Sequence, residues 1–222
     1  GGGVALRAGN GVEGPGCLPK LLADASVVVD FSSPAFACAA AEACVLARKP
    51  FVTGTTGFSG RQLAILKKAA RVIPVFYSPN MSPAVNLTFA LSAFAAERLK
   101  GFDIHINEVH HKGKKDSPSG TALRYARNVA AVRKGVVPSI TSARIGDVVG
   151  EHTVVYAGPH ERIEITHRAH SRAVFAAGAL RAAAWLCSQR PGLYDYSDLL
   201  GIAAGVSGWS REEALEKKGL YE

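Results

Sequence analysis

The fold is decided by residues 26–80, which read SVVVDFSSPAFACAAAEACVLARKPFVTGTTGFSGRQLAILKKAARVIPVFYSPN. Three short apolar runs in this stretch are typical of strands buried on both faces: residues 26–31, 51–53 and 72–76. Between them, Ser33-Pro34 begins a helix that ends near Lys49, and the capping-box pattern SGRQ at 59–62 begins a second helix. Strands that alternate with helices through short connections predict parallel pairing and right-handed crossovers. We therefore expect part of a doubly wound α/β domain.

The pattern changes after Asn80, where strictly alternating strands replace the continuous apolar ones. Helices are expected from Ser82-Pro83 onward, from about 121 to 134 and over 173–188, and strands over 102–107, 152–157 and 162–169. Alternation of apolar and polar side chains is typical of a strand with one polar or solvated face. These elements predict a separate α+β domain.

Composition and charge exclude several classes of protein. Among the 222 residues, 48% are hydrophobic, and 26 Lys and Arg stand against 18 Asp and Glu, a net charge of +8. This balance excludes wholesale disorder, and no apolar run approaches the ~18 residues of a membrane span. Because the only basic cluster is Lys112, Lys114 and Lys115, a small anionic ligand is favoured over nucleic acid. The cysteines lack CxxC or zinc spacing and are expected to be reduced core residues of a cytoplasmic protein: Cys17, Cys38, Cys44 and Cys187.

The strongest candidate for chemistry is EVHHKGKKDSPSGT at 108–121, which leaves a strand and enters a helix. Ser119 is placed to cap that helix, where the free amides of Gly120 and Thr121 would face an anion. Lys114 adds charge, and a histidine donates a proton near neutral pH. The alternative is a solvated basic loop with an ordinary N-cap, and composition alone leaves the two about even. A metal site is disfavoured, because adjacent histidines on a strand point to opposite faces and no third ligand is obvious.

Three further segments follow the parallel strands of the first domain: Phe31-Ser32-Ser33, Gly54-Thr55-Thr56-Gly57 and Ser78-Pro79-Asn80-Met81. Glycines there permit close approach of a cofactor to the backbone, and the hydroxyls can bond its ribose or amide. Tight turns between strand and helix use the same residues, so the glycine turn alone is a weak signal. Together the segments gather at the carboxyl edge of one sheet, where folds of this kind bind ligands.

Six motifs in collinear order closely resemble those of the dihydrodipicolinate reductase family: DFSSP at 30–34, GTTGFS at 54–59, SPNMSPAVN at 78–86, EVHHKGKKDSPSGTAL at 108–123, GDVVGEH at 146–152 and ITHRAHSRAVFAAGAL at 165–180. The resemblance runs from about residue 20 to the end, and the histidine–lysine motif is its most specific part. It implies a Rossmann-like, doubly wound parallel-sheet domain over 1–82 plus 173–222. It also implies an inserted α+β domain for substrate binding and oligomerisation over 83–172, and a homotetramer built largely through the sheets of that domain.

The resemblance further implies an activity, in which NADH or NADPH delivers hydride to the cyclic dicarboxylate 4-hydroxy-tetrahydrodipicolinate on the diaminopimelate route to lysine. His110 matches the proposed general acid of the family, and Lys114 its proton-donating or carboxylate-binding lysine. The residues that match its substrate-carboxylate contacts are His111, Ser119, Gly120 and Thr121. Those that match its cofactor contacts are Phe31, Ser32, Gly54, Thr55, Thr56, Ser78, Pro79, Asn80 and Met81.

The sequence departs from the family's pattern in three places. The first strand, the GxxGxMG turn and the first helix have no counterpart, so we expect a longer reductase that lacks this unit. Residues 1–7 then match the end of the second Rossmann strand, with Arg7 near the adenosine ribose, where a cation favours a 2′-phosphate. The stretch 133–145 is shorter than expected for the family. Pro83-Ala84 stands where members commonly have a residue followed by glycine.

Two functions from different classes are compatible with these residues. The favoured one is the NAD(P)H-dependent reductase, because an intact HHKGK…PSGT constellation is hard to explain without catalysis. The alternative is a non-catalytic paralogue or fragment that has lost cofactor binding and only assembles or binds anionic ligands. The missing pyrophosphate loop motivates this alternative, since that loop supplies the helix N-terminus for the two cofactor phosphates.

Overall fold

The computed structural model describes residues 22–202, which divide into two compact units. The first contains the described residues up to Met81 together with Phe175–Leu199, and the second contains Ser82–Val174. Arg7, Cys17 and the strand expected around Arg7 lie outside the described residues. Among residues 22–202, no helix is long and apolar enough to cross a membrane.

The first unit is built on sheet A, which has four parallel strands in the order β1-β2-β3-β8. These strands are β1 Val28–Asp30, β2 Phe51–Thr53, β3 Pro74–Tyr77 and β8 Gly192–Tyr194. Helices α2 (Pro34–Ala47) and α3 (Gly60–Ala69) connect the first three strands, and the short helix α7 (Tyr196–Leu199) follows β8. Both long helices start as the sequence predicts, because Ser33 caps α2 and Ser59 forms a capping box with Gln62 in α3.

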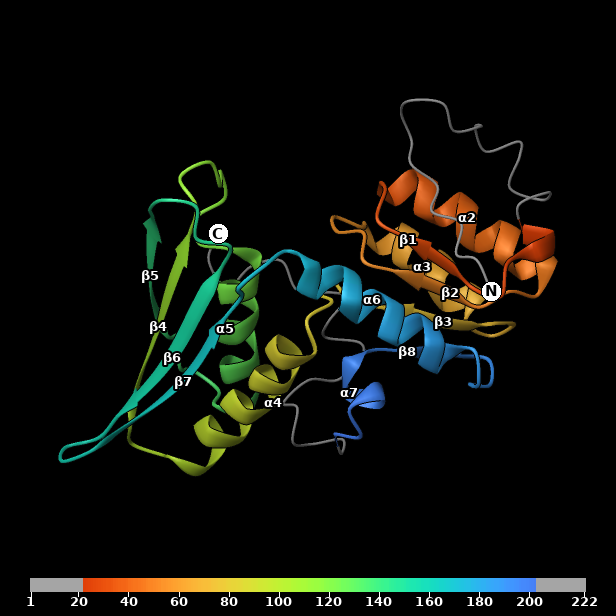
Figure 1. The fold of residues 1–222 in the computed structure, drawn as a ribbon. Helices are drawn as coiled ribbons and strands as arrows, with labels where there is room; N and C mark the ends of the chain where they lie inside the picture. The colour runs from red at the N-terminus through yellow and green to blue at the C-terminus, as the bar shows by residue number, and fades with distance from the viewer. Residues whose placement is uncertain (1–21, 203–222) are drawn as a thin grey trace. The chain divides into compact units, whose positions relative to one another are not determined.

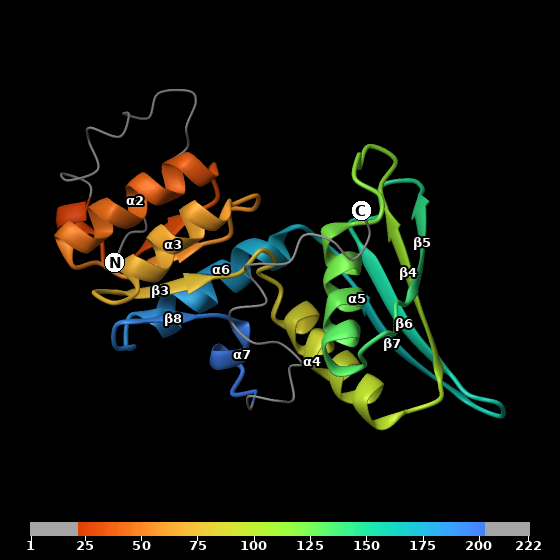
Figure 2. The ribbon, with the colours of Figure 1, turned by 180° about the vertical axis from the view of Figure 1, so that it is seen from behind.

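Helices cover both faces of sheet A (Figures 1 and 2). Phe76 on β3 packs edge-on against Trp185 of α6 (Ala173–Leu186), with ring centroids 6.2 Å apart. The next residue, Tyr77, packs edge-on against Phe58, just before α3, at 5.5 Å. Since successive strand side chains point to opposite faces, α6 and α3 lie on opposite faces of the sheet. This arrangement confirms the doubly wound α/β domain.

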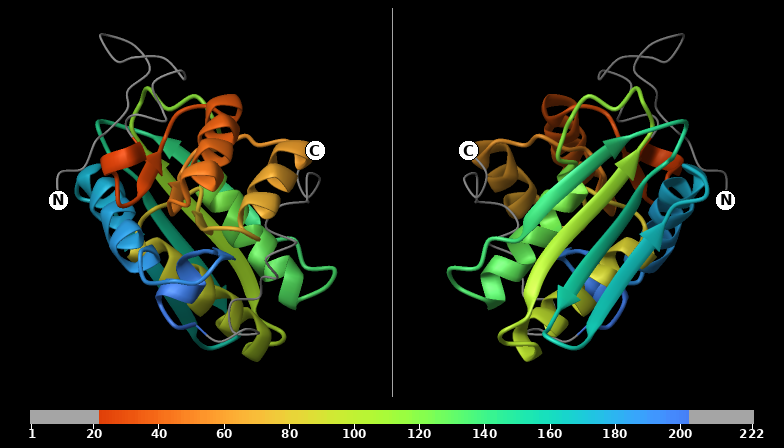
Figure 3. Two further views of the ribbon diagram at one scale, coloured as in Figure 1. Left: turned by 90° about the vertical axis from the view of Figure 1, so that its right-hand side faces the viewer. Right: turned by 90° about the vertical axis from the view of Figure 1, so that its left-hand side faces the viewer.

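The second unit is built on sheet B, in the order β5-β4-β6-β7, with β5 parallel to β4 and the other pairs antiparallel. These strands are β4 Asp103–His110, β5 Ser139–Arg144, β6 Glu151–Ala157 and β7 Arg162–Arg168. Helices α4 (Pro83–Arg98) and α5 (Gly120–Val132) pack on one face of the sheet, around a core that includes Phe89, Tyr125 and Tyr156. Within the described residues of this unit, no helix covers the other face, which Figure 3 shows in its right-hand view.

Several sequence-based boundaries need correction. Strand β3 starts at Pro74 instead of Val72, because Val72 and Ile73 donate backbone hydrogen bonds to Ala69 in the turn after α3. Strand β4 continues to His110, three residues beyond its expected end, and strands β5 and β8 were not predicted. Cys38 and Cys44 are buried free thiols as expected, whereas Cys187, just beyond α6, is exposed.

Candidate active site

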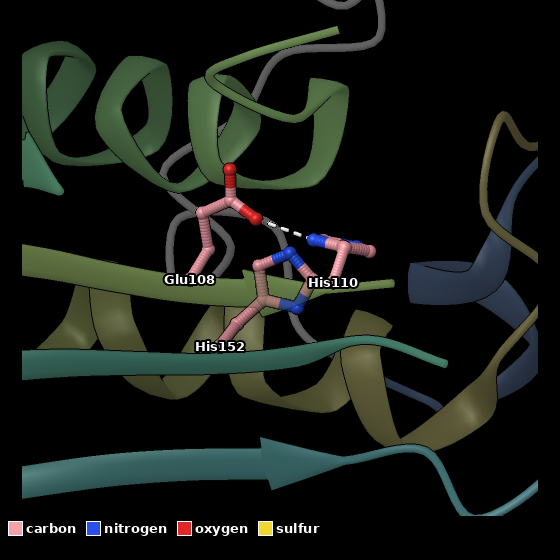
Figure 4. Close-up of side chains that lie close together, drawn as sticks. All are labelled: Glu108, His110 and His152. Atoms are coloured by element: carbon pink, nitrogen blue, oxygen red, sulfur yellow. Dashed lines mark hydrogen bonds and ion pairs between the residues drawn. The ribbon is translucent and has the colours of Figure 1, made fainter. Parts of the chain in front are cut away.

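Strand β4 carries two polar residues onto the buried face of sheet B. Ile104 and Ile106 belong to the core, and Glu108 and His110 follow them on the same face because strand side chains alternate. Glu108 is 0% exposed and His110 is 8% exposed. His152 on β6 pairs directly with Glu108 across the ladder, so that the three side chains meet (Figure 4).

Both carboxylate oxygens of Glu108 accept hydrogen bonds. Arg144 on β5 donates from Nη2 to Oε1 at 2.8 Å and from Nη1 to Oε2 at 3.0 Å. The backbone N–H of Ser119 donates to Oε1 at 3.2 Å, and His110 Nδ1 bonds to Oε2. Burial favours a raised pKa, but the hydrogen bonds from Arg144, Ser142 and His110 outweigh it and hold the pKa of Glu108 at about 2. The carboxylate is therefore charged at neutral pH.

The imidazole of His110 is held in one orientation by its neighbours. Because a carboxylate only accepts, His110 donates its Nδ1–H to Glu108, which leaves Nε2 to take up or release a proton. The ring of His152 packs edge-on against it, with centroids 5.0 Å apart. A Cβ added to Gly150 would lie 3.0 Å from Nε2, so a larger residue there would push the ring. Burial lowers the pKa of His110, although the Glu108 carboxylate opposes this shift.

His152 connects the strand residues to the start of α5. Its Nε2 lies 3.1 Å from Oγ of Ser119, and the same Oγ accepts the backbone N–H of Ala122 as the N-cap of the helix. Burial lowers the pKa of His152 to about 3, so this ring is neutral at physiological pH. The uncharged ring of His152 therefore packs against His110 without adding charge.

The loop between β4 and α5 holds its own carboxylate. Lys114 Nζ donates to Asp116 Oδ1 at 2.7 Å, and the backbone N–H of Gly120 also bonds to this carboxylate. The hydrogen bond from Lys114 is the main cause of the lowered pKa of Asp116. Arg144 Nη2 donates to the backbone oxygen of Asp116 at 2.6 Å, which ties the loop to the Glu108 pair. Asp116 thus contacts two groups that the sequence assigns to a substrate carboxylate.

The remaining loop residues surround this pair. The backbone oxygen of His111 accepts the N–H of Lys114 at 3.1 Å, and the His111 side chain is half-buried. Thr121, in the first turn of α5, is also half-buried. The structure therefore brings His110, Lys114 and the helix start together around one loop, as the sequence predicts.

Glu108, His110 and His152 also place one potential ligand atom each within 4.8 Å of the others. Within the protein, however, His110 Nδ1 already bonds to Glu108 and His152 Nε2 to Ser119, while His152 Nδ1 is buried without a hydrogen-bond partner. The carboxylate of Glu108 forms a two-point ion pair with Arg144, whose positive charge opposes a cation at the same oxygens. We therefore assign this cluster to a hydrogen-bonded network.

A second polar network lies at the carboxyl edge of sheet A. Asp30, at the end of β1, is 4% exposed and accepts hydrogen bonds at Oδ2 from Oγ1 of Thr53 and Oγ1 of Thr55, both at 2.7 Å. Ser32 donates its backbone N–H to Thr55 Oγ1 at 2.9 Å, and its hydroxyl to Asp30. Asp30 thus holds the segments that follow β1 and β2 against each other.

The residues matched to cofactor contacts divide into exposed and buried groups at this edge. Phe31 is 55% exposed, and Ser32, Thr56 and Pro79 are exposed as well. A Cβ on Gly54 would lie 2.2 Å from the Phe31 ring, so a larger residue there would displace this exposed ring. Thr55, Ser78 and Met81 form the buried group. Asn80 is half-buried, and its backbone oxygen accepts a hydrogen bond from the Ser78 hydroxyl at 2.7 Å.

Comparisons with known proteins place the chain in a family. Two family models match it, dihydrodipicolinate reductase N-terminus over residues 3–81 and dihydrodipicolinate reductase C-terminus over residues 84–200. The chain belongs to the dihydrodipicolinate reductase family. The resemblance seen in the sequence is therefore confirmed.

Relatives within the dihydrodipicolinate reductase family cover most of the chain. The 4-hydroxy-tetrahydrodipicolinate reductase of Anaeromyxobacter dehalogenans strain 2CP-1 is 46% identical over 209 residues, 85% of this chain and 77% of that protein. The enzyme of the same name from Aquifex aeolicus is 44% identical over 203 residues, 83% of this chain and 77% of that protein. A dipicolinate-bound dihydrodipicolinate reductase from Paenisporosarcina sp. TG-14 shares the fold, with a TM-score of 0.73, 22% identity, and coverage of 82% of this chain and 77% of that chain.

Sequence reasoning missed four residues that organise these sites in the dihydrodipicolinate reductase fold: Asp30, Glu108, Arg144 and His152. Glu108 was within reach, because the alternation of Ile104 and Ile106 continues through Glu108 to His110. Arg144 had no such signal, since strand β5 lacks alternation of apolar and polar side chains. His152 stood in a predicted strand, but only the register with Glu108 gives it a place in the site.

Proposed function

We propose that the protein catalyses the NAD(P)H-dependent reduction of 4-hydroxy-tetrahydrodipicolinate to tetrahydrodipicolinate, a step of diaminopimelate and lysine biosynthesis. Its relatives are named for this reductase, which supports an enzyme over the non-catalytic alternative. The observation that carries the proposal is the buried Glu108–His110 pair beside the Lys114 loop and the N-terminus of α5.

The substrate is a cyclic dicarboxylate, and the loop offers groups suited to a carboxylate. Lys114 supplies an ammonium group, and the first turn of α5 supplies backbone N–H groups at the positive end of the helix dipole. His111 is placed nearby by the turn at Lys114. Ser119 contributes indirectly, because its N–H is donated to Glu108 and its hydroxyl caps the helix.

His110 supplies the proton in this proposal. The 4-hydroxyl group of the substrate leaves as water, and hydride addition to the unsaturated ring leaves negative charge that a general acid neutralises. Nε2 is the nitrogen of His110 that Glu108 does not use. The Glu108 carboxylate stabilises the imidazolium before the proton is given up. Lys114 binds a substrate carboxylate and so fixes the orientation of the substrate ring. A fixed orientation lowers the entropic cost of the reaction.

The carboxyl edge of sheet A fits a nicotinamide dinucleotide. Parallel strands end there, and the Phe31 ring and the residues Ser32 and Thr56, which carry hydroxyls, are exposed. Gly54 has no side chain that would collide with the Phe31 ring. Bound there, a reduced nicotinamide supplies the hydride. Asp30 keeps the two loops in register through Thr53 and Thr55.

The proposal is tested by incubating the purified protein with 4-hydroxy-tetrahydrodipicolinate and either NADH or NADPH. Substrate-dependent oxidation of the cofactor, followed by nicotinamide absorbance, is the expected result, and the ratio of the two kcat/KM values gives the cofactor preference. Fluorescence titration of each cofactor without substrate separates binding from turnover. Binding without oxidation, or no binding at millimolar cofactor, would favour the non-catalytic alternative.

We further propose a homotetramer assembled through sheet B. The face of this sheet that the helices leave open carries half-buried residues such as Thr153, Val155 and Thr166. A sheet face without a covering helix suits face-to-face packing of sheets from two copies. Analytical ultracentrifugation is expected to give a mass of four chains, and a monomer at micromolar concentration would contradict this assembly.

A further inference from the structure

We propose that Glu108 is a positioning residue for His110 and for the start of α5, with Arg144 as its counter-ion. This inference rests on the proposed function, in which His110 is the proton donor. Glu108 itself faces the core at 0% exposure and acts through the groups that it holds.

The geometry places one carboxylate at the junction of three segments. Through His110 it holds the end of β4, through Arg144 it holds the end of β5, and through the Ser119 N–H it holds the start of α5. Arg144 extends the junction to the backbone oxygen of Asp116 in the loop that carries Lys114. A shift of this carboxylate would therefore move the acid and the anion-binding loop together.

A merely structural role does not explain the choice of a buried ion pair. Buried ion pairs can often be replaced by apolar residues of similar volume without loss of stability, because desolvation offsets the attraction. The position of Glu108, two residues before His110 on the same face of β4, continues a row of apolar side chains. An apolar residue would satisfy the core there, but it would leave the Nδ1–H of His110 without an acceptor.

The charges of Glu108 and Arg144 also affect the pKa of His110. The groups that act on His110 come from four segments: Glu108 on β4, Lys114 in the loop, Arg144 on β5 and His152 on β6. Glu108 favours the protonated ring, Lys114 and Arg144 oppose it, and His152 is neutral. Removing the carboxylate should thus lower the pKa of His110, and removing only the guanidinium should raise it.

Two variants test these opposite signs through the pH profile of kcat. A general acid works only when protonated, so kcat falls as the pH rises through the pKa of His110. Glu108→Gln is expected to move this descending limb to lower pH, and Arg144→Gln to move it to higher pH. Each unit of downward shift costs ~tenfold in kcat well above the pKa. Glu97→Gln, which removes an exposed ion pair with Arg98 on α4, is the matched control and should leave the profile unchanged.

The same shift is measured without turnover by NMR titration of ¹⁵N-labelled histidine rings, with His110 assigned through the spectrum of His110→Gln. A lowered pKa of His110 in Glu108→Gln supports the inference even if the wild-type protein fails to reduce the proposed substrate. An active wild type whose His110 pKa and kcat limb are unmoved by Glu108→Gln overturns the inference and leaves the proposed function intact. If Glu108→Gln does not fold, the double variant Glu108→Gln/Arg144→Gln removes both charges. It too is expected to lower the pKa, because the effect of Glu108 on His110 is larger than that of Arg144.

Discussion

Replacing Gly178 by alanine tests how α6 packs in the sheet A unit. A Cβ at this position would lie 1.7 Å from the backbone oxygen of Met81 and 2.7 Å from Oη of Tyr196. Carbon–oxygen contacts normally begin at about 3.3 Å. Because the nearer obstacle is backbone, no rotamer change relieves the overlap, and either α6 or the Met81 segment must move.

The cost follows from three contributions. Overpacking a tight interior typically costs about 1–3 kcal/mol of the free energy of unfolding. The buried hydrogen bond from Tyr196 Oη to the Met81 oxygen, 2.8 Å long, is strained or lost for about 1 kcal/mol more. The better helix propensity of alanine returns up to about 1 kcal/mol. A net destabilisation of about 2 kcal/mol corresponds to a fall in Tm of about 4–8 °C for a chain of this size.

Thermal unfolding followed by circular dichroism measures this change. Gly60→Ala is the control, because Gly60 begins α3 and a Cβ there meets no atom within 4 Å. That variant is expected to unfold at or slightly above the wild-type temperature. If Gly178→Ala is as stable as Gly60→Ala, α6 does not pack against Met81 as described, and the reasoning is wrong.

The remaining predictions concern the site in sheet B. His110→Gln should lower kcat by ~10²–10⁴, the usual worth of a general acid, and a loss below threefold in steady-state assays would remove His110 from that role. Lys114→Ala should raise the KM for the dicarboxylate and lower kcat, and unchanged values of both would exclude it from substrate binding. Asp116→Asn should act in the opposite direction and lower this KM about 1.4–5-fold, because it removes a competing exposed ion pair of about 0.2–1 kcal/mol. An increased KM would show that Asp116 helps to bind substrate. The pKa of Glu108 is lowered from 4.5 to about 2 in the folded protein, so the ionised carboxylate stabilises the fold fully above pH 4.5. This stabilisation is lost as the pH falls toward 2. The decline of Tm below pH 4.5 should therefore be shallower in Glu108→Gln than in the wild type.

Most of sheet A was predictable because its signals are local. The run before Asp30, the proline after Ser33 and the capping box at Ser59 each specify a strand or a helix start within a few residues. Strand β8 lacks such a signal, since its three residues are half-buried and owe their conformation to pairing with β3. Strand β5 is similar, because its exposed and half-buried residues are ordered by the ladder with β4.

The candidate site likewise has parts that depend on local sequence and parts that depend on strand pairing. The cap at Ser119 and the histidine–lysine loop are contiguous in sequence, so residue types marked them as a candidate site, and the family resemblance gave their expected roles. The partner of Glu108 on β5 lies 36 residues away along the chain, and its identity depends on the register of two strands. Only the structure shows that Arg144 neutralises the carboxylate that holds His110.

The basic residues around this loop are already paired with carboxylates of the protein. Lys114 pairs with Asp116, and Arg144 pairs with Glu108, so these four groups sum to zero before any ligand binds. Glu108 is enclosed and cannot leave Arg144, whereas the Asp116 side chain is 57% exposed and can turn into solvent at little cost. A dicarboxylate therefore gains a cation most readily by replacing Asp116 at Lys114 and at the N-terminus of α5. We therefore expect the site to favour a ligand whose carboxylate competes with that of Asp116, whereas a neutral analogue of the ring would leave Asp116 in place.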